Sequence, residues 1–354
     1  MAITYHAGRR IQGTSTDFGT AGAGIPAVSG GWVELARTTL GSAGDNISVG
    51  SLPDKRYYMV LGDYIPTGGN VNGTHRYNND SGSNYANRYS DNGGADGTGT
   101  SSTEVWCNPQ EDDHHLFGVS YISNLAGKEK LVLFNGANAN STGASNAPAR
   151  RETSGKWSNT SSAINRIDAI NTDAGSFNTN SEVVVLGWDP ADTHTTNFWE
   201  ELDSVTLGSA GANLDSNTFT AKKYLWIQMY QNGMTSGANT TYQFNSDTGS
   251  NYARRWDING GTEFTGVSQT SALAHNGVGS ETANFTNMFI INNSANEKLV
   301  ISHSNYATTA GAGTAPSREE HVMKWANTSA QITSIDFDAT NFGIGSILKV
   351  WGSD

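Results

Sequence analysis

The chain repeats itself, and this duplication limits its fold more than any other feature of the sequence. Residues 32–44 (WVELARTTLGSAG) match residues 199–211 (WEELDSVTLGSAG), 167 positions later. After one inserted residue the matches continue, with KWSNTSSAI at 156–164 and KWANTSAQI at 324–332. Matches this long at a nearly constant offset predict a tandem duplication of one unit of about 155 residues.

The repeat also predicts the domain organisation. Residues 1–30 have no counterpart and form a glycine-rich N-terminal arm. We expect the first repeat at residues 31–188, a short polar linker at 189–198 and the second repeat at 199–354. A linker of this length leaves the two domains little freedom, so they are expected to pack together.

Within each repeat the recognisable elements are strands. Apolar and aromatic runs are bounded by turn residues, as expected for a chain with 41 glycines and only 15% charged residues. No stretch has helical periodicity beyond a turn or two, so we expect eight to ten short strands per repeat. The predicted fold class is all-β, with two tandem homologous antiparallel β-sandwich domains of jelly-roll type and an N-terminal extended arm. The clearest strand candidates are 56–65, 115–122, 130–135, 182–188, 223–231, 286–292, 298–303 and 346–351.

Charge and cysteine content exclude several classes of function. The net charge is −12, and no local basic patch is visible, so a nucleic-acid partner is not expected. The single cysteine, Cys107, excludes an intramolecular disulfide framework and is expected to be a small buried apolar residue. Neither a signal peptide nor a run of 18 apolar residues is present, so no membrane partner is expected.

No constellation of catalytic residues stands out. The most reactive segment, 110–117 (QEDDHHLF), carries Asp112, Asp113, His114 and His115. Adjacent histidines on a strand point to opposite faces and cannot easily share one ion, so a polar loop leading into a strand is the better interpretation. No catalytic residue and no cofactor are predicted, and the chain is not expected to be an enzyme.

Two acidic residues are the nearest candidates for a metal site. Asp80 and Asp247 stand at equivalent positions in NDSGSNY and SDTGSNY, where hard oxygens on a tight turn could bind calcium. The alternative is that aspartate and glycine only build the turn that precedes a strand. The acidic positions of an EF-hand loop are missing, so we predict no metal.

Two further duplicated positions could bind other ligands. Trp157 and Trp325 could form a platform for sugar rings, but each precedes Asn-Thr-Ser, so a core tryptophan beside a turn is favoured. The pair Arg150 and Arg151, with Arg318 and Glu319 opposite, could recognise an anion. The sequence therefore does not identify which residues bind a ligand.

The amino-acid sequences of three segments resemble those of a known group of proteins. Residues 5–18 (YHAGRRIQGTSTDF), residues 31–45 and the segment NDSGSNYANRYSDNGG are similar to tandem-repeat structural proteins of marine tailed phages and related environmental viruses. This resemblance covers the arm and both repeats, and no catalytic residue is carried over from it. It implies a capsid decoration protein or a tail-fibre-like protein built of β-sandwich domains.

The resulting prediction is a non-enzymatic structural protein of the virion, assembled in a host cytoplasm. Its expected partners are other copies of itself, as a homo-oligomer for which a trimer is one expectation, and other virion proteins. The arm is expected to contact a neighbouring subunit through Tyr5, Arg9, Arg10, Ile11 and Phe18. The alternative is a lectin-like tandem module that binds a host-surface glycan as its receptor.

Overall fold

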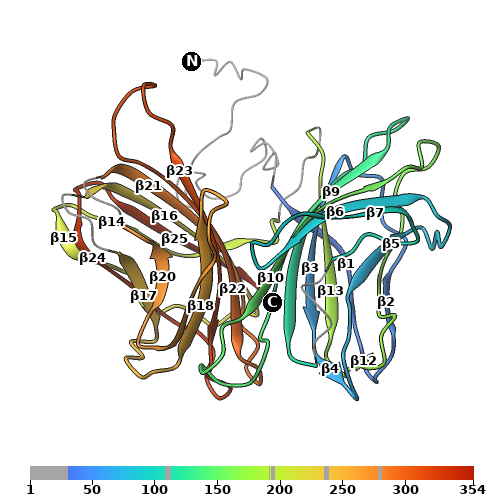
Figure 1. The fold of residues 1–354 in the computed structure, drawn as a ribbon, viewed down its shortest axis with the longest axis horizontal. Coiled ribbons are helices and arrows are strands. Elements are labelled where there is room, and N and C mark those ends of the chain that lie inside the picture. Colours follow the sequence, from blue (N-terminus) through green and yellow to red (C-terminus); the bar gives the residue numbers. More distant parts are fainter. Residues whose placement is uncertain (1–30, 108–112, 191, 193–195, 235–238, 278–280) are drawn as a thin grey trace, which may run out of the picture.

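The computed structural model describes residues 31–107, 113–190, 192, 196–234, 239–277 and 281–354 (Figure 1). These residues form twenty-five β-strands and no helix. The predicted fold class is confirmed, because the chain is all-β with two tandem antiparallel β-sandwiches. The predicted N-terminal arm lies outside the described residues. Within the described ranges, no helix is long and apolar enough to cross a membrane.

Among the described residues, both repeats hold more strands than the eight to ten expected, thirteen in the first and twelve in the second, and the additional sheets of the first repeat consist of very short strands. An eight-stranded sheet has the order β1-β13-β3-β8-β9-β10-β6-β7, and smaller sheets of order β2-β11-β5 and β12-β4 lie beside it. Its strands are β1 (Val33–Thr39), β2 (Asn46–Val49), β3 (Tyr57–Tyr64), β4 (Pro66–Thr67), β5 (Thr74–Tyr77), β6 (Tyr85–Asp91), β7 (Gly97–Ser102), β8 (Leu116–Ser123), β9 (Lys130–Asn138), β10 (Ala149–Trp157), β11 (Ile167–Ile170), β12 (Ser176–Phe177) and β13 (Glu182–Trp188).

The second repeat has the same large sheet, with the order β14-β25-β16-β21-β22-β23-β18-β19, and a four-stranded sheet of order β15-β24-β17-β20. Its strands are β14 (Glu200–Thr206), β15 (Gly211–Asp215), β16 (Tyr224–Met234), β17 (Thr240–Phe244), β18 (Tyr252–Ile258), β19 (Phe264–Gln269), β20 (Ala272–His275), β21 (Glu281–Ile291), β22 (Lys298–Ala307), β23 (Ser317–Trp325), β24 (Ile335–Phe342) and β25 (Ile347–Ser353).

The two repeats match in register as well as in strand order. Tyr57 pairs with Ser123 in the first repeat, and the equivalent Tyr224 pairs with Ile291 in the second. The first strand of each repeat has a bulge at the same place, at Leu35 and at Leu202. A shared bulge is a conformational detail that two unrelated sandwiches would not share, so pairs of equivalent positions can be compared directly.

The loop between the last two strands of each large sheet begins with an Asn-Gly turn. Asn92 and Gly93 both have positive φ angles, as do the equivalent Asn259 and Gly260. The backbone N of Gly94 donates to the carbonyl oxygen of Asp91 at 2.9 Å, which closes a tight turn around Asn92 and Gly93 within the longer loop. Asparagine and glycine adopt positive φ angles at least cost. The Asn-Gly pairs therefore build the turn that follows β6 and the turn that follows β18.

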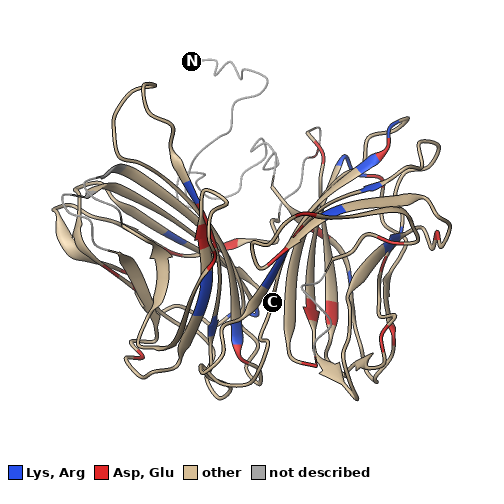
Figure 2. Ribbon diagram, viewed as in Figure 1, with Lys and Arg blue, Asp and Glu red and all other residues tan. Residues whose placement is uncertain are grey.

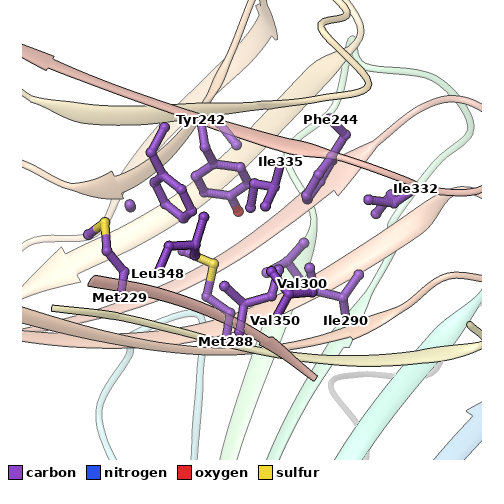
Figure 3. Packing of buried hydrophobic residues seen from close by; sticks show 14 of the residues in the cluster. Met229, Tyr242, Phe244, Met288, Ile290, Val300, Ile332, Ile335, Leu348 and Val350 are labelled. Atoms are coloured by element: carbon purple, nitrogen blue, oxygen red, sulfur yellow. The ribbon is translucent and has the colours of Figure 1, made fainter. Parts of the chain in front are cut away.

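Each sandwich has its own apolar core between its large and small sheets. In the first repeat Tyr58, Val60 and Val183 of the large sheet meet Ile47 and Ile167 of the small sheet. Cys107 is buried in this core, and burial raises the pKa of its thiol well above the ordinary range. Figure 3 shows the matching core of the second repeat, where Tyr242 and Phe244 lie opposite Met288, Ile290 and Val300.

A third apolar core joins the two repeats. It is made by the outer faces of the two large sheets, which meet in the middle of the molecule (Figure 1). The first repeat contributes Leu61, Phe117 and Val184, and the second contributes Phe289 and Leu299, all of them buried. Because both faces of each large sheet are apolar there, the molecule is stacked as small sheet, large sheet, large sheet and small sheet. Burial of this third core fixes the repeats relative to one another.

Candidate functional site

Asp80 and Asp247, the two candidates considered for calcium, hold turns together by hydrogen bonds. Asp80 accepts hydrogen bonds from the Trp157 indole Nε1 at 2.7 Å, from the Gly82 backbone N at 2.9 Å and from Asn84 Nδ2 at 2.9 Å. Partial burial alone would raise the pKa of Asp80, but these hydrogen bonds outweigh it and lower the pKa. Both carboxylate oxygens are thus occupied by N–H donors, which makes Asp80 a turn-building residue.

Asp247 repeats this arrangement in the second repeat. It accepts from Trp325 Nε1 at 2.7 Å, from the Gly249 backbone N at 2.8 Å and from Asn251 Nδ2 at 2.9 Å. Two independent copies of the same contacts indicate a requirement of the fold. Within the described part of the chain, no group of three or more histidine, cysteine, aspartate or glutamate residues is arranged to hold a metal ion.

The alternative interpretation of Trp157 and Trp325 as a sugar-stacking platform is wrong. Each indole is only 1% exposed, so neither ring presents a face to a ligand in solution. The ring of Trp157 instead stacks on Tyr85 and carries the ammonium group of Lys130 at 5.9 Å from its centroid. Both tryptophans are core residues beside a turn.

The two histidines of the QEDDHHLF segment separate as expected. His114 lies 2.7 Å from Asp113, while His115 is buried. His115 Nε2 is 2.6 Å from Asp63 Oδ1, and its Nδ1 is 3.1 Å from the carbonyl oxygen of Glu297 in the other repeat. Asp112 lies outside the described residues. His115 is therefore part of the contact between the repeats.

Buried ion pairs support this contact at one end. Lys223 of the second repeat reaches Asp63 at 3.0 Å and Glu182 at 3.1 Å in the first, and the hydroxyl of Tyr224 donates to Glu182 at 2.8 Å. Burial would raise the pKa of Asp63, but His115 and Lys223 reverse this and lower it. The charges are paired, which is the condition for burying them without a large loss of stability.

Arg150 is the centre of the contact at the other end. Its buried guanidinium is 2.9 Å from Glu152, 3.2 Å from Glu263 and 3.2 Å from Glu320, and it also contacts Asp257. Three of these four carboxylates belong to the second repeat. Figure 2 shows how basic and acidic residues lie together along the strands at the centre of the molecule.

The suggested anion site is therefore wrong for both arginines of the pair. Arg150 is enclosed by carboxylates, and Arg151 forms two hydrogen bonds with Asp91 at 2.6 and 2.7 Å. Glu319 faces the opposite side of its sheet, where it lies 3.2 Å from His275 and 2.9 Å from His321. Burial would raise the pKa of Glu319, but these histidines lower it to about 2.

Equivalent carboxyl groups of the two repeats meet next to Arg150. Burial, opposed by Arg150 and reinforced by the negative charge of Glu320, raises the pKa of Glu152 to about 7. A hydrogen bond between the two side chains favours the proton on Glu152 and the charge on Glu320, whose pKa is lowered. Two carboxyl groups in direct contact are closer than the roughly 5 Å or more that glycoside hydrolysis requires. The pair thus fits an interface better than an acid–base catalyst.

The titration of Glu152 predicts a pH-dependent stability. The folded chain holds a proton on Glu152 up to about pH 7, whereas the unfolded chain loses it near the ordinary value of 4.5, so this group destabilises the fold as the pH rises from about 5 to 8. We expect Glu152→Gln to raise the melting temperature by roughly 2–4 °C at about pH 8 and hardly at all at about pH 5. Circular dichroism melts at both pH values measure this. A constant difference between variant and parent would contradict it, and Glu129→Gln, at an exposed ion pair with Lys156, is the control.

A large apolar groove lies on the outer face of the first repeat. It has a volume of about 460 Å³, and its polar surface is small. Leu131 and Leu133 are 57% and 59% exposed, and Tyr57 stacks on Trp188 with ring centroids 5.4 Å apart. We call this feature the aromatic groove; it is lined by Trp32, Tyr57, Tyr58, Tyr121, Ile122, Ser123, Leu131, Leu133 and Trp188.

Sequence reasoning missed the aromatic groove, although β9 contained a signal for it. In Lys130–Asn138, Val132 and Phe134 point into the first sandwich, while Leu131 and Leu133 point away from it. A strand with apolar residues on both faces indicates a sheet that is covered on both sides. The residues predicted for the arm, Tyr5, Arg9, Arg10, Ile11 and Phe18, lie outside the described residues.

Comparisons with known proteins add little. No protein-family model and no curated protein matches the chain. Among solved structures, the mouse laminin alpha1 chain, domains LG4-5, is similar over 93% of this chain and 92% of that chain, with 9% identity. Its TM-score is 0.21, which is too low to indicate anything about the function of this chain. The class is thus defined by the fold itself: a tandem β-sandwich protein with an open apolar groove.

Proposed function

We propose that this chain is a non-enzymatic structural component of a virus particle, a capsid decoration or fibre-like protein that associates with copies of itself. The observation that carries the proposal is the aromatic groove, because large exposed apolar surfaces on a folded protein mark sites of association. The resemblance of the arm and both repeats to structural proteins of tailed phages supports the virion as its location. The acidic net charge of −12 would keep the chains soluble until they assemble.

The composition of the aromatic groove favours a protein partner. Tryptophan and tyrosine are enriched among the residues that contribute most to protein interfaces. Leu131 and Leu133 add two aliphatic side chains that are more than half exposed. A partner with its own apolar surface would cover all of these groups at once.

A lectin-like function is the second candidate, and one observation favours it. The stacked rings of Tyr57 and Trp188 line an open groove, as an aromatic platform for a sugar would. The groove offers few polar groups, however, and a sugar also needs hydrogen-bond partners for its hydroxyl groups.

The two functions are separated by one pair of measurements on the full chain. A structural component should co-sediment with purified parent particles at a fixed and high copy number, and it should give no signal on a glycan array. Absence from the particles would overturn the proposal. Glycan binding that is lost in Tyr57→Ala and kept in Tyr89→Ala would establish the lectin function instead.

A further inference from the structure

The contact between the repeats uses different parts of two equivalent faces. In the first repeat, the covered part of the outer face contains Leu61, Phe117 and Ala137. In the second repeat, the covered part contains Tyr224, Phe289, Leu299 and Ile301. Cross-strand pairing shows which residues correspond. Asp63 pairs with Phe117 in the first repeat, and their counterparts Tyr230 and Phe285 pair in the second. Tyr121 pairs with Leu133, and their counterparts Phe289 and Ile301 pair in the same way.

Equivalent residues therefore lie in opposite environments in the two repeats. Leu299 and Ile301 are buried by the first repeat, but their counterparts Leu131 and Leu133 line the open aromatic groove. Phe117 is buried by the second repeat, but its counterpart Phe285 is 41% exposed. The contact is heterologous, which means that the two repeats use different parts of the equivalent face. Each repeat therefore keeps uncovered the part that the other repeat uses.

The unused surface of the second repeat can be defined from the sheet. Tyr230 and Phe285 are exposed and lie directly opposite each other on β16 and β21. Ile347 pairs with Tyr230 on its other side. We call this surface the Phe285 face; it consists of Gln228, Tyr230, Phe285, Asn287, Asn305 and Ile347.

We propose that the aromatic groove of one chain binds the Phe285 face of a second copy, so that the contact within each chain is repeated between chains. The occupant follows from the duplication: inside the chain, the counterpart of the Phe285 face already covers the counterpart of the aromatic groove. The aromatic groove is also continuous with the third core, since Tyr121 packs against Phe289 with ring centroids 6.4 Å apart. This inference rests on the self-association in the proposed function and names its two surfaces.

The contact between chains differs in its chemistry from the one within the chain. Asp63 and Glu182, which pair with Lys223 inside the chain, correspond to Tyr230 and Ile347 on the Phe285 face. The ion pairs are thus replaced by apolar groups, so the contact depends mainly on burial of aromatic and aliphatic side chains. A heterologous contact continues from copy to copy, and it closes into a ring when the rotation per copy divides a full turn.

Complementary variants test this inference. Leu133→Glu blocks only the aromatic groove, and Phe285→Glu blocks only the Phe285 face. By sedimentation velocity, the parent chain should associate with increasing concentration, and each variant alone should associate at least about tenfold more weakly. An equimolar mixture should form a 1:1 dimer that grows no further, because each variant supplies the surface that the other lacks.

The control is Phe264→Glu. Phe264 is 46% exposed and lies with its cross-strand partner Trp256 on the face of the large sheet that is opposite to the Phe285 face. Circular dichroism verifies folding, and Leu133→Ser replaces any groove variant that is misfolded. A monomeric parent chain, a mixture that stays monomeric, or variants that associate like the parent would overturn the inference. If association requires residues 2–30 but is unaffected by changes in the aromatic groove or the Phe285 face, the inference is overturned, whereas the proposed structural role is not. Absence of the chain from particles removes that role without deciding how copies associate.

Discussion

Replacing Arg150 by methionine is expected to destabilise the protein by about 3–5 kcal/mol, because it leaves buried carboxylates without their shared cation. The guanidinium touches Glu152, Asp257, Glu263 and Glu320, so its loss places like charges against one another between the repeats. Denaturant unfolding followed by tryptophan fluorescence measures the change. The loss should shrink at about pH 5, where Glu152 is protonated.

Arg151→Met is the matched control for this variant. Arg151 is the neighbouring residue of the same strand but pairs with a single carboxylate, Asp91, inside the first repeat. Its replacement should cost about 1 kcal/mol. Equal losses for the two arginines, or a loss at Arg150 that does not depend on pH, would show that the cluster does not act as the contact described above.

Truncation of either duplicated core tryptophan is expected to cost about 3–5 kcal/mol. Trp157→Ala would open a cavity beside Tyr85 and remove the indole donor of Asp80. Trp325→Ala would open a cavity beside Phe244 and remove the indole donor of Asp247. Because both sites have the same contacts, we expect similar losses of unfolding free energy in the two repeats. Thermal and denaturant unfolding of the two variants provide the comparison.

Trp32→Ala is the control for the tryptophans, because Trp32 lines the aromatic groove and is only half-buried. It should cost clearly less than either core variant. A loss below about 1 kcal/mol at Trp157 or Trp325 would mean that these indoles are not the main packing groups of their cores.

The amino-acid sequence by itself determined the architecture within each repeat. The duplication identified two equivalent units, and apolar runs located β3, β8, β9, β13, β16, β21, β22 and β25, although β21 begins five residues before its predicted start and β22 ends four residues after its predicted end. The position of each tryptophan before a turn correctly favoured a core role for Trp157 and Trp325. The strand positions and the core tryptophans depend on residues near one another in the chain, which is why periodicity and turn chemistry reveal them.

The very short strands could not be predicted in this way. Pro66–Thr67 and Ser176–Phe177 pair with each other although more than a hundred residues separate them. Two residues carry no periodicity, so only the closure of the sandwich decides that they form a strand.

Only the tertiary structure decided which apolar faces are covered. Leu133 and Ile301 are equivalent residues on equivalent strands, yet Leu133 is largely exposed and Ile301 is buried. Likewise, Arg150 is buried among carboxylates while its counterpart Arg318 is exposed. The alternation of residues along a strand specifies that a face of the sheet is apolar. Which part of that face is covered depends on how the two large sheets are displaced relative to each other. Here the contact is heterologous, so two similar units use different parts of the same face, and the part of the first repeat that is left uncovered is the aromatic groove.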